Sequence, residues 1–184
     1  MTLPEAEFTV LRQTIARRGT ARMILVPVTL IGWGALALII LLFTDYPIAW
    51  LIPLTVLAGG FEAIHALHVG VERIGRYLQV NYESPDGPHW ESTVTRVGPA
   101  LPGGGIDPLF AFVFAGATFI NIIPTLSPAL GPFPVPTRIE LGVIAALHFL
   151  FIVRIVRARG AAARQRAVEL ESFKAVREQK ISNP

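Results

Sequence analysis

Two ionisable residues, Glu62 and His65, lie three positions apart near the end of residues 47–69, an otherwise apolar segment long enough to cross a membrane. Ionisable side chains are costly inside a bilayer, so they usually mark a functional or a paired site. A carboxylate can hold or release a proton, and an imidazole can do the same or bind a metal. The pair therefore predicts proton chemistry, metal binding or mutual pairing.

Further polar residues extend this pattern along the same helix. At about 100° per residue, the side chains of Glu62, His65, His68, Glu72 and Arg76 fall within about 120° of arc. Because the other sides of the helix are apolar, this face should point toward neighbouring helices or a water-filled cleft. We call these five residues the polar stripe.

The polar stripe is open to a structural and a transport interpretation. In the structural one, Glu62 with His65 and Glu72 with Arg76 satisfy one another at i,i+3 and i,i+4 and hold helices together. In the other, Glu62 and His65 titrate on the pathway of a small proton-coupled transporter. Both use the same residues, so the sequence leaves both open.

A third interpretation is a haem or metal site. His65, His68 and His148 are the candidate ligands, and Glu62-x-x-His65 is also the spacing with which bundle helices bind di-iron centres. Such a site needs ligands from other helices, and the remaining apolar segments offer only His148 and the boundary residue Glu140. The cofactor therefore stays an alternative.

Composition places these residues in a membrane protein. The 184-residue chain is 52% hydrophobic and only 16% charged, whereas about a quarter of a soluble domain is charged. Four apolar segments, near residues 23–43, 47–69, 109–126 and 140–156, approach the roughly 20 residues that a spanning helix needs. The chain has no cysteine, which excludes disulfides, thiolate metal sites and cysteine nucleophiles.

The distribution of Lys and Arg predicts the orientation. Residues 1–22 hold four, residues 70–107 hold three and residues 154–184 hold eight, whereas the opposite side has only Arg138. This bias places both termini and the loop 70–107 in the cytoplasm, typically across a bacterial inner membrane. It also explains the net charge of +3 without a nucleic-acid partner.

Both ends of the chain should be basic helices at the membrane surface. The N-terminal arm, residues 1–22, and the tail, residues 157–184, combine apolar residues with arginines that favour an anionic leaflet or a partner helix. A solvated helical tail is the other interpretation. The predicted surface cations are Arg12, Arg17, Arg18, Arg157, Arg159 and Arg164.

The sequence thus predicts an all-α polytopic membrane protein. Residues 23–156 should form a four-helix transmembrane bundle, flanked by an amphipathic cytoplasmic arm and a C-terminal helix. The preferred function is non-enzymatic helix association, as a homo-oligomer or as an accessory or structural subunit of a membrane complex. The partners are then the lipid bilayer and other membrane chains, or further copies of this one.

Overall fold

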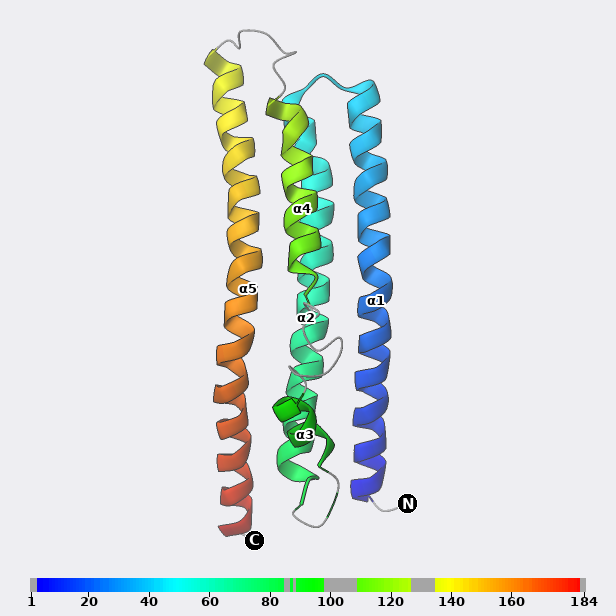
Figure 1. The fold of residues 1–184 in the computed structure, drawn as a ribbon, viewed down its shortest axis with the longest axis vertical. Helices are drawn as coiled ribbons and strands as arrows, with labels where there is room; N and C mark the ends of the chain where they lie inside the picture. Colours follow the sequence, from blue (N-terminus) through cyan, green and yellow to red (C-terminus); the bar gives the residue numbers. More distant parts are fainter. Residues whose placement is uncertain (1–2, 85–86, 88, 98–108, 127–134, 183–184) are drawn as a thin grey trace. The chain divides into compact units, whose positions relative to one another are not determined.

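The computed structural model describes residues 3–84, 87, 89–97, 109–126 and 135–182, and every regular element among them is helical (Figure 1). Parts of the predicted loop 70–107, namely 85–86, 88 and 98–107, lie outside the described residues. The elements in chain order are α1 (Leu3–Phe43), η1 (Pro47–Trp50), α2 (Leu51–Asn81), α3 (Trp90–Val97), α4 (Ala111–Ile122), η3 (Ile123–Leu126) and α5 (Val135–Ser182). The all-α class is confirmed for this part of the chain.

Three helices are long and apolar enough to cross a membrane. They are Leu3–Phe43, Pro47–Asn81 and Arg138–Gln179, and they contain three of the four predicted spans. The remaining predicted span, residues 109–126, forms a shorter apolar helix, Ala111–Leu126, made of α4 and η3. The combined length of α4 and η3 is about 26 Å, slightly less than the roughly 30 Å thickness of the hydrocarbon core in a typical bilayer.

The predicted arm and tail continue the long helices. α1 runs for 41 residues through Pro27, so residues 3–22 and the span 23–43 form one helix. α5 runs for 48 residues past Gly160 and ends at Ser182. Each of the two helices has an apolar segment and a charged segment that follow one another along the chain. Neither helix therefore has one apolar face along its whole length.

The chain divides into two compact units, which we name by their composition. The apolar unit comprises Met23–His65 and Leu109–Arg159, and the polar unit comprises Met1–Arg22, Ala66–Pro108 and Gly160–Pro184. α1, α2 and α5 each contribute one segment to each unit.

Phe61 lies at the centre of the apolar unit. Its ring is fully buried and makes edge contacts with Phe114 of α4 and Phe151 of α5, at centroid distances of 5.5 and 5.9 Å. Leu57 and Ile64 extend this core along α2, and α1 packs against it with four half-buried side chains, namely Leu25, Val26, Leu30 and Trp33. Aromatic edge contacts of this kind add to the burial of apolar area.

The contacts in the apolar unit fix the directions of its helices. Thr29 of α1 meets Gly60, and Gly32 meets Val56, so α1 and α2 are antiparallel. The backbone N–H of Ile48 donates to Glu140 at 2.8 Å, and Glu62 meets Arg154 further along both segments. Residues 47–65 therefore run parallel to α5.

Candidate functional site

The polar stripe is divided between the two units. Glu62 and His65 belong to the apolar unit, whereas His68, Glu72 and Arg76 belong to the polar unit. All five lie on α2, as the sequence predicted, but each group has its own partners on other helices.

Arg154 of α5 is the ion-pair partner of Glu62. Its Nη2 donates to Glu62 Oε2 at 2.7 Å and lies 3.4 Å from His65 Nδ1. The His65 ring stacks on Phe61 with a centroid distance of 6.2 Å. The side chains of Arg154 and Glu62 are 39% and 48% exposed. Because Arg154 belongs to α5 and Glu62 to α2, their ion pair connects these two helices in the apolar unit.

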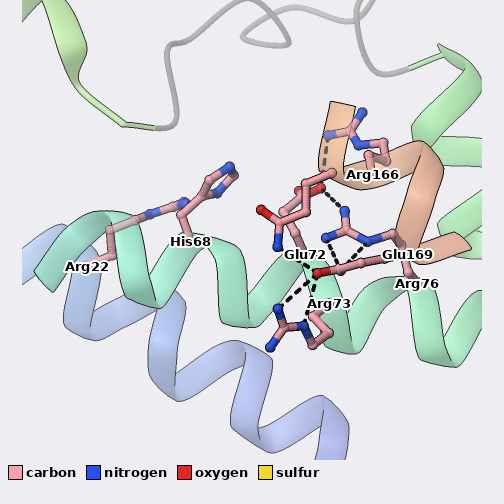
Figure 2. A network of polar contacts seen from close by, with 8 residues as sticks. Arg22, His68, Glu72, Arg73, Arg76, Arg166 and Glu169 are labelled. Atoms are coloured by element: carbon pink, nitrogen blue, oxygen red, sulfur yellow. Dashed lines mark hydrogen bonds and ion pairs between the residues drawn. The ribbon is translucent and has the colours of Figure 1, made fainter. Parts of the chain in front are cut away.

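In the polar unit, Glu169 of α5 is the centre of a denser cluster (Figure 2). Its carboxylate accepts from Arg76 Nη2 at 2.7 Å, from Arg73 Nη2 at 2.9 Å and from Gln165 Nε2 at 2.7 Å. The side chain of Glu169 is 16% exposed and that of Arg76 is 7% exposed. Two arginines of α2 thus hold a nearly buried carboxylate of α5.

Glu72 completes this cluster. Its Oε2 accepts from Arg76 Nη1 at 3.1 Å within α2 and from Arg166 Nη2 of α5 at 2.9 Å. The Glu72–Arg76 pair is the i,i+4 contact that the sequence indicated. We call Glu72, Arg73, Arg76, Arg166 and Glu169 the ion cluster; it contains three cations and two anions.

The ion cluster is built to stay charged. Burial raises the pKa of Glu169, but the hydrogen bonds from Arg73, Arg76 and Gln165 outweigh burial and lower this pKa from 4.5 to about 2. A carboxylate with so low a pKa does not take up a proton near neutral pH. The arrangement therefore favours helix fixation over proton transfer.

A second buried polar group lies in the apolar unit, around Asn121 of α4. Trp33 Nε1 donates to Asn121 Oδ1 at 3.0 Å, and Asn121 Nδ2 donates to the carbonyl of Trp50 at 2.9 Å. The same amide group lies 2.9 Å from His148 Nε2, and His148 Nδ1 lies 2.8 Å from the carbonyl of Ile144. Asn121 thereby connects α1, η1 and α5 to α4.

These contacts assign the protons of His148. A carbonyl oxygen only accepts, so Nδ1 carries the hydrogen and donates to Ile144. Nε2 then holds the lone pair and accepts from Asn121. Both ring nitrogens are used, and His148 has no lone pair left for a metal or a haem iron.

The other two candidate ligands each face an arginine. Arg154 Nη2 lies 3.4 Å from His65 Nδ1, and Arg22 Nη1 donates to His68 Nδ1 at 3.1 Å. A guanidinium beside an imidazole opposes a second cation there. Within the part of the chain that the structure describes, no group of three or more His, Asp or Glu side chains is arranged to hold a metal ion.

Arg22 differs from the arginines of the ion cluster. Its Nε is buried and has no hydrogen-bond partner among the described residues, and an unmet buried donor usually costs about 1–3 kcal/mol. One turn earlier, Arg18 lies over Gly70 of α2, where a Cβ would come within 2.2 Å of Arg18 Nη1. Figure 2 shows the side chain of Arg22 reaching from α1 to His68.

The other predicted surface cations have mixed environments. Arg17, Arg157, Arg159 and Arg164 are exposed, and Arg159 lies 5.0 Å from the centre of the Phe112 ring. Arg12 forms an ion pair with Glu91 of α3 at 2.8 Å.

Sequence reasoning missed the partners of the polar stripe. The tail, residues 157–184, has a charged side that includes Glu169 and Arg166 and a loose apolar side that includes Val168 and Val176, and the sequence alone links neither side to residues 62–76. In the structure the charged side contacts α2, whereas Val168 and Val176 are 66% and 63% exposed. The one signal in the sequence was the polar stripe itself, because its charged residues needed oppositely charged residues on other helices.

Comparisons of the chain with protein-family models, with curated proteins and with solved structures found no match.

Proposed function

We propose that the chain is an integral protein of a bacterial inner membrane that acts by helix association rather than by catalysis. It would associate with copies of itself or serve as an accessory or structural subunit of a membrane complex. One contrast supports this proposal. The ionisable side chains of the polar stripe are used in contacts within the chain, whereas the apolar faces of the long helices are left largely uncovered.

The uncovered apolar area is large. Only 11% of the most apolar 18-residue stretch of α1 is buried. The corresponding values are 33% for Pro47–Asn81 and 22% for Arg138–Gln179 of α5. Exposed apolar side chains such as Ile31 and Phe149 are expected to contact lipid or another membrane helix.

Small residues on α5 favour a helix partner for part of this surface. Gly142 and Ala146 are both exposed and lie one turn apart, and a Cβ at Gly142 would meet no heavy atom within 4 Å. In membranes, small residues at this spacing let two helix backbones approach closely. Phe149, one turn further, is 65% exposed and can pack beside them.

Helix direction supports a bundle with four crossings. In the apolar unit, residues 47–65 and α5 run parallel, so the chain must cross back between them if both segments span the bilayer. The apolar segment Ala111–Leu126 is available for this crossing. Both termini would then lie on one side, which the count of Lys and Arg assigns to the cytoplasm.

The two rival functions gain less from the geometry. A proton pathway through Glu62 would have to compete with its ion pair to Arg154, and a haem or metal site would have to displace the partner of His148 or lie beside a guanidinium. Helix association requires neither change.

Cysteine cross-linking in native membranes tests the proposed face of α5. The chain has no cysteine, so an Ala146→Cys variant places a single thiol on this face. If this face joins two copies of the chain, oxidation should trap a disulfide-linked dimer, and adding Gly142→Leu should weaken trapping because the added side chain separates the helices. Val143→Leu, an apolar enlargement at the next position, is the matched control. Failure to trap a dimer would contradict contact between two copies of the chain through this face.

A further inference from the structure

Two arginines of α1, Arg18 and Arg22, occupy a special position in the sequence and in the polar unit. They are four residues apart and therefore lie on one face of the helix, about 40° apart. Arg22 is the last charged residue before the uncharged stretch that ends at Asp45. If α1 crosses the bilayer as proposed, both guanidinium groups lie at the depth of the lipid headgroups.

Four other arginines of the polar unit form ion pairs with carboxylates. Arg12 has Glu91, Arg73 and Arg76 have Glu169, and Arg166 has Glu72. In the part of the chain that the structure describes, neither Arg18 nor Arg22 forms an ion pair with a carboxylate. Among the described residues, no carboxylate therefore balances their positive charges directly.

Contacts with α2 hold both guanidinium groups in place. Arg22 donates from Nη1 to His68 Nδ1 at 3.1 Å, and its buried Nε remains without an acceptor among the described residues. His68 is 6% exposed, so this anchor is itself well packed. Arg18 fits over Gly70 because that residue has no side chain. Two guanidinium groups are thus held close to one helix surface.

We propose that Arg18 and Arg22 form a binding site for a phosphate group, presented at the membrane boundary by the headgroup of an anionic phospholipid. Phosphate oxygens accept several hydrogen bonds from guanidinium groups and carry the charge that these arginines lack as a partner. His68 acts as a positioning residue because it holds Arg22 and does not touch the phosphate. The site rests on the proposed membrane location but not on whether the chain associates.

Native mass spectrometry of the full chain in mixed micelles tests the site. With equal amounts of phosphatidylglycerol and phosphatidylcholine, the wild-type chain should retain phosphatidylglycerol preferentially. An R18Q/R22Q variant should lower this preference about tenfold or more, since each arginine near an anionic headgroup contributes to binding. The single variants R18Q and R22Q should each lower it as well, and Arg17→Gln, which removes one charge from an adjacent exposed position, is the control for them. An equal loss with R17Q would show unspecific attraction and overturn the proposal.

Gly70→Ala tests the geometry without changing the charge. The new Cβ would lie 2.2 Å from the present position of Arg18 Nη1 and must displace this flexible side chain. The variant should fold, because only the end of a side chain has to move, yet it should lose part of the lipid preference. Gly19→Ala, where a Cβ meets nothing within 4 Å, should retain it. Unchanged preference in both G70A and R18Q/R22Q would contradict the site.

Competition with inorganic phosphate separates the two sources of the ligand. If millimolar phosphate leaves the bound phosphatidylglycerol in place, the headgroup of a lipid is the ligand. If phosphate displaces it from the wild-type chain but has no effect on R18Q/R22Q, the two arginines still bind phosphate, and the free ion takes the place of the lipid in the assignment.

Discussion

Glu169 is the residue on which the ion cluster depends most. It joins Arg73 and Arg76 of α2 to α5, and its carboxylate is shielded from solvent. An apolar side chain at position 169 could not accept these hydrogen bonds, and the nearly buried Arg76 would then keep fewer partners. Its removal is therefore the sharpest single change in the polar unit.

Glu169→Gln should destabilise the chain by about 2 kcal/mol, because a nearly buried guanidinium loses one of its two carboxylate partners. Glu171→Gln is the control: Glu171 pairs with Lys174 on the surface and is 71% exposed, so its loss should cost less than about 0.5 kcal/mol. Unfolding by SDS titration in mixed micelles would measure both values. Equal effects of the two variants would contradict a structural role of the ion cluster.

The pH dependence of stability should carry the signature of Glu169. Its pKa is about 2 in the folded chain against 4.5 for an unperturbed glutamate. Because the folded pKa is the lower one, the stabilisation is fully present above about pH 4.5 and is lost as the pH falls toward 2. The difference in thermal midpoint between wild type and E169Q should narrow over this window. A difference independent of pH would contradict the proposed ionisation.

The sequence predicted the positions of the charged residues but only some of their ion pairs. The Glu72–Arg76 contact follows from helical spacing alone. The partners Arg154 and Glu169 come from α5, about 90 residues away in sequence, and helical periodicity contains no information on such contacts.

Gly60 permits a close approach of α1 and α2 in the apolar unit. A Cβ there would lie 2.2 Å from Cγ2 and 2.3 Å from Oγ1 of Thr29 on α1. Thr29 is buried, so its side chain has little room to move. The crossing of α1 and α2 therefore depends on a residue without a side chain.

Gly60→Ala should destabilise the apolar unit by about 1–3 kcal/mol through overpacking. Gly59→Ala, where a Cβ meets nothing within 4 Å, should be neutral or slightly stabilising, since alanine is the better helix former. Adding Thr29→Ala to Gly60→Ala should restore part of the loss by removing Cγ2 and Oγ1. Unfolding of the wild-type chain and the three variants in micelles measures this, and equal stability of G59A and G60A would contradict the close crossing.

The extent of the elements was more predictable than their packing. The long uncharged run predicted the first span, and α1 ends at Phe43 as expected. The third predicted span is shorter because Phe110 adopts a left-handed conformation (φ 52°) before α4, and the last turn is a 3-10 helix. The continuation of α5 past Gly160 followed from its helix-forming composition.

For the whole molecule, the number of crossings decides on which sides the ends lie. Four crossings place both termini together, whereas three would separate them. Single-cysteine variants can distinguish these cases because the chain has no cysteine of its own.

A membrane-impermeant maleimide should label Asp45→Cys in intact cells, because residue 45 lies between the first two spans. Thr9→Cys and Ser182→Cys should react only after lysis, since both exposed positions are predicted to be cytoplasmic. Labelling of Ser182→Cys in intact cells, with Thr9→Cys protected, would indicate three crossings and refute the four-helix arrangement.

Membrane character could be predicted from composition, because an apolar surface needs an apolar solvent whatever the packing. The function could not. Exposed apolar faces look the same in the sequence whether they contact lipid or a partner helix, and only spacing such as that of Gly142 and Ala146 favours the second.

The most direct test of helix association is the mass of the chain released from native membranes without detergent, in polymer-bounded lipid discs. Helix association predicts complexes that contain more than one protein chain, either several copies of this one or this chain in fixed stoichiometry with another membrane protein. Discs that contain a single copy and no other protein, at native expression levels, would contradict it.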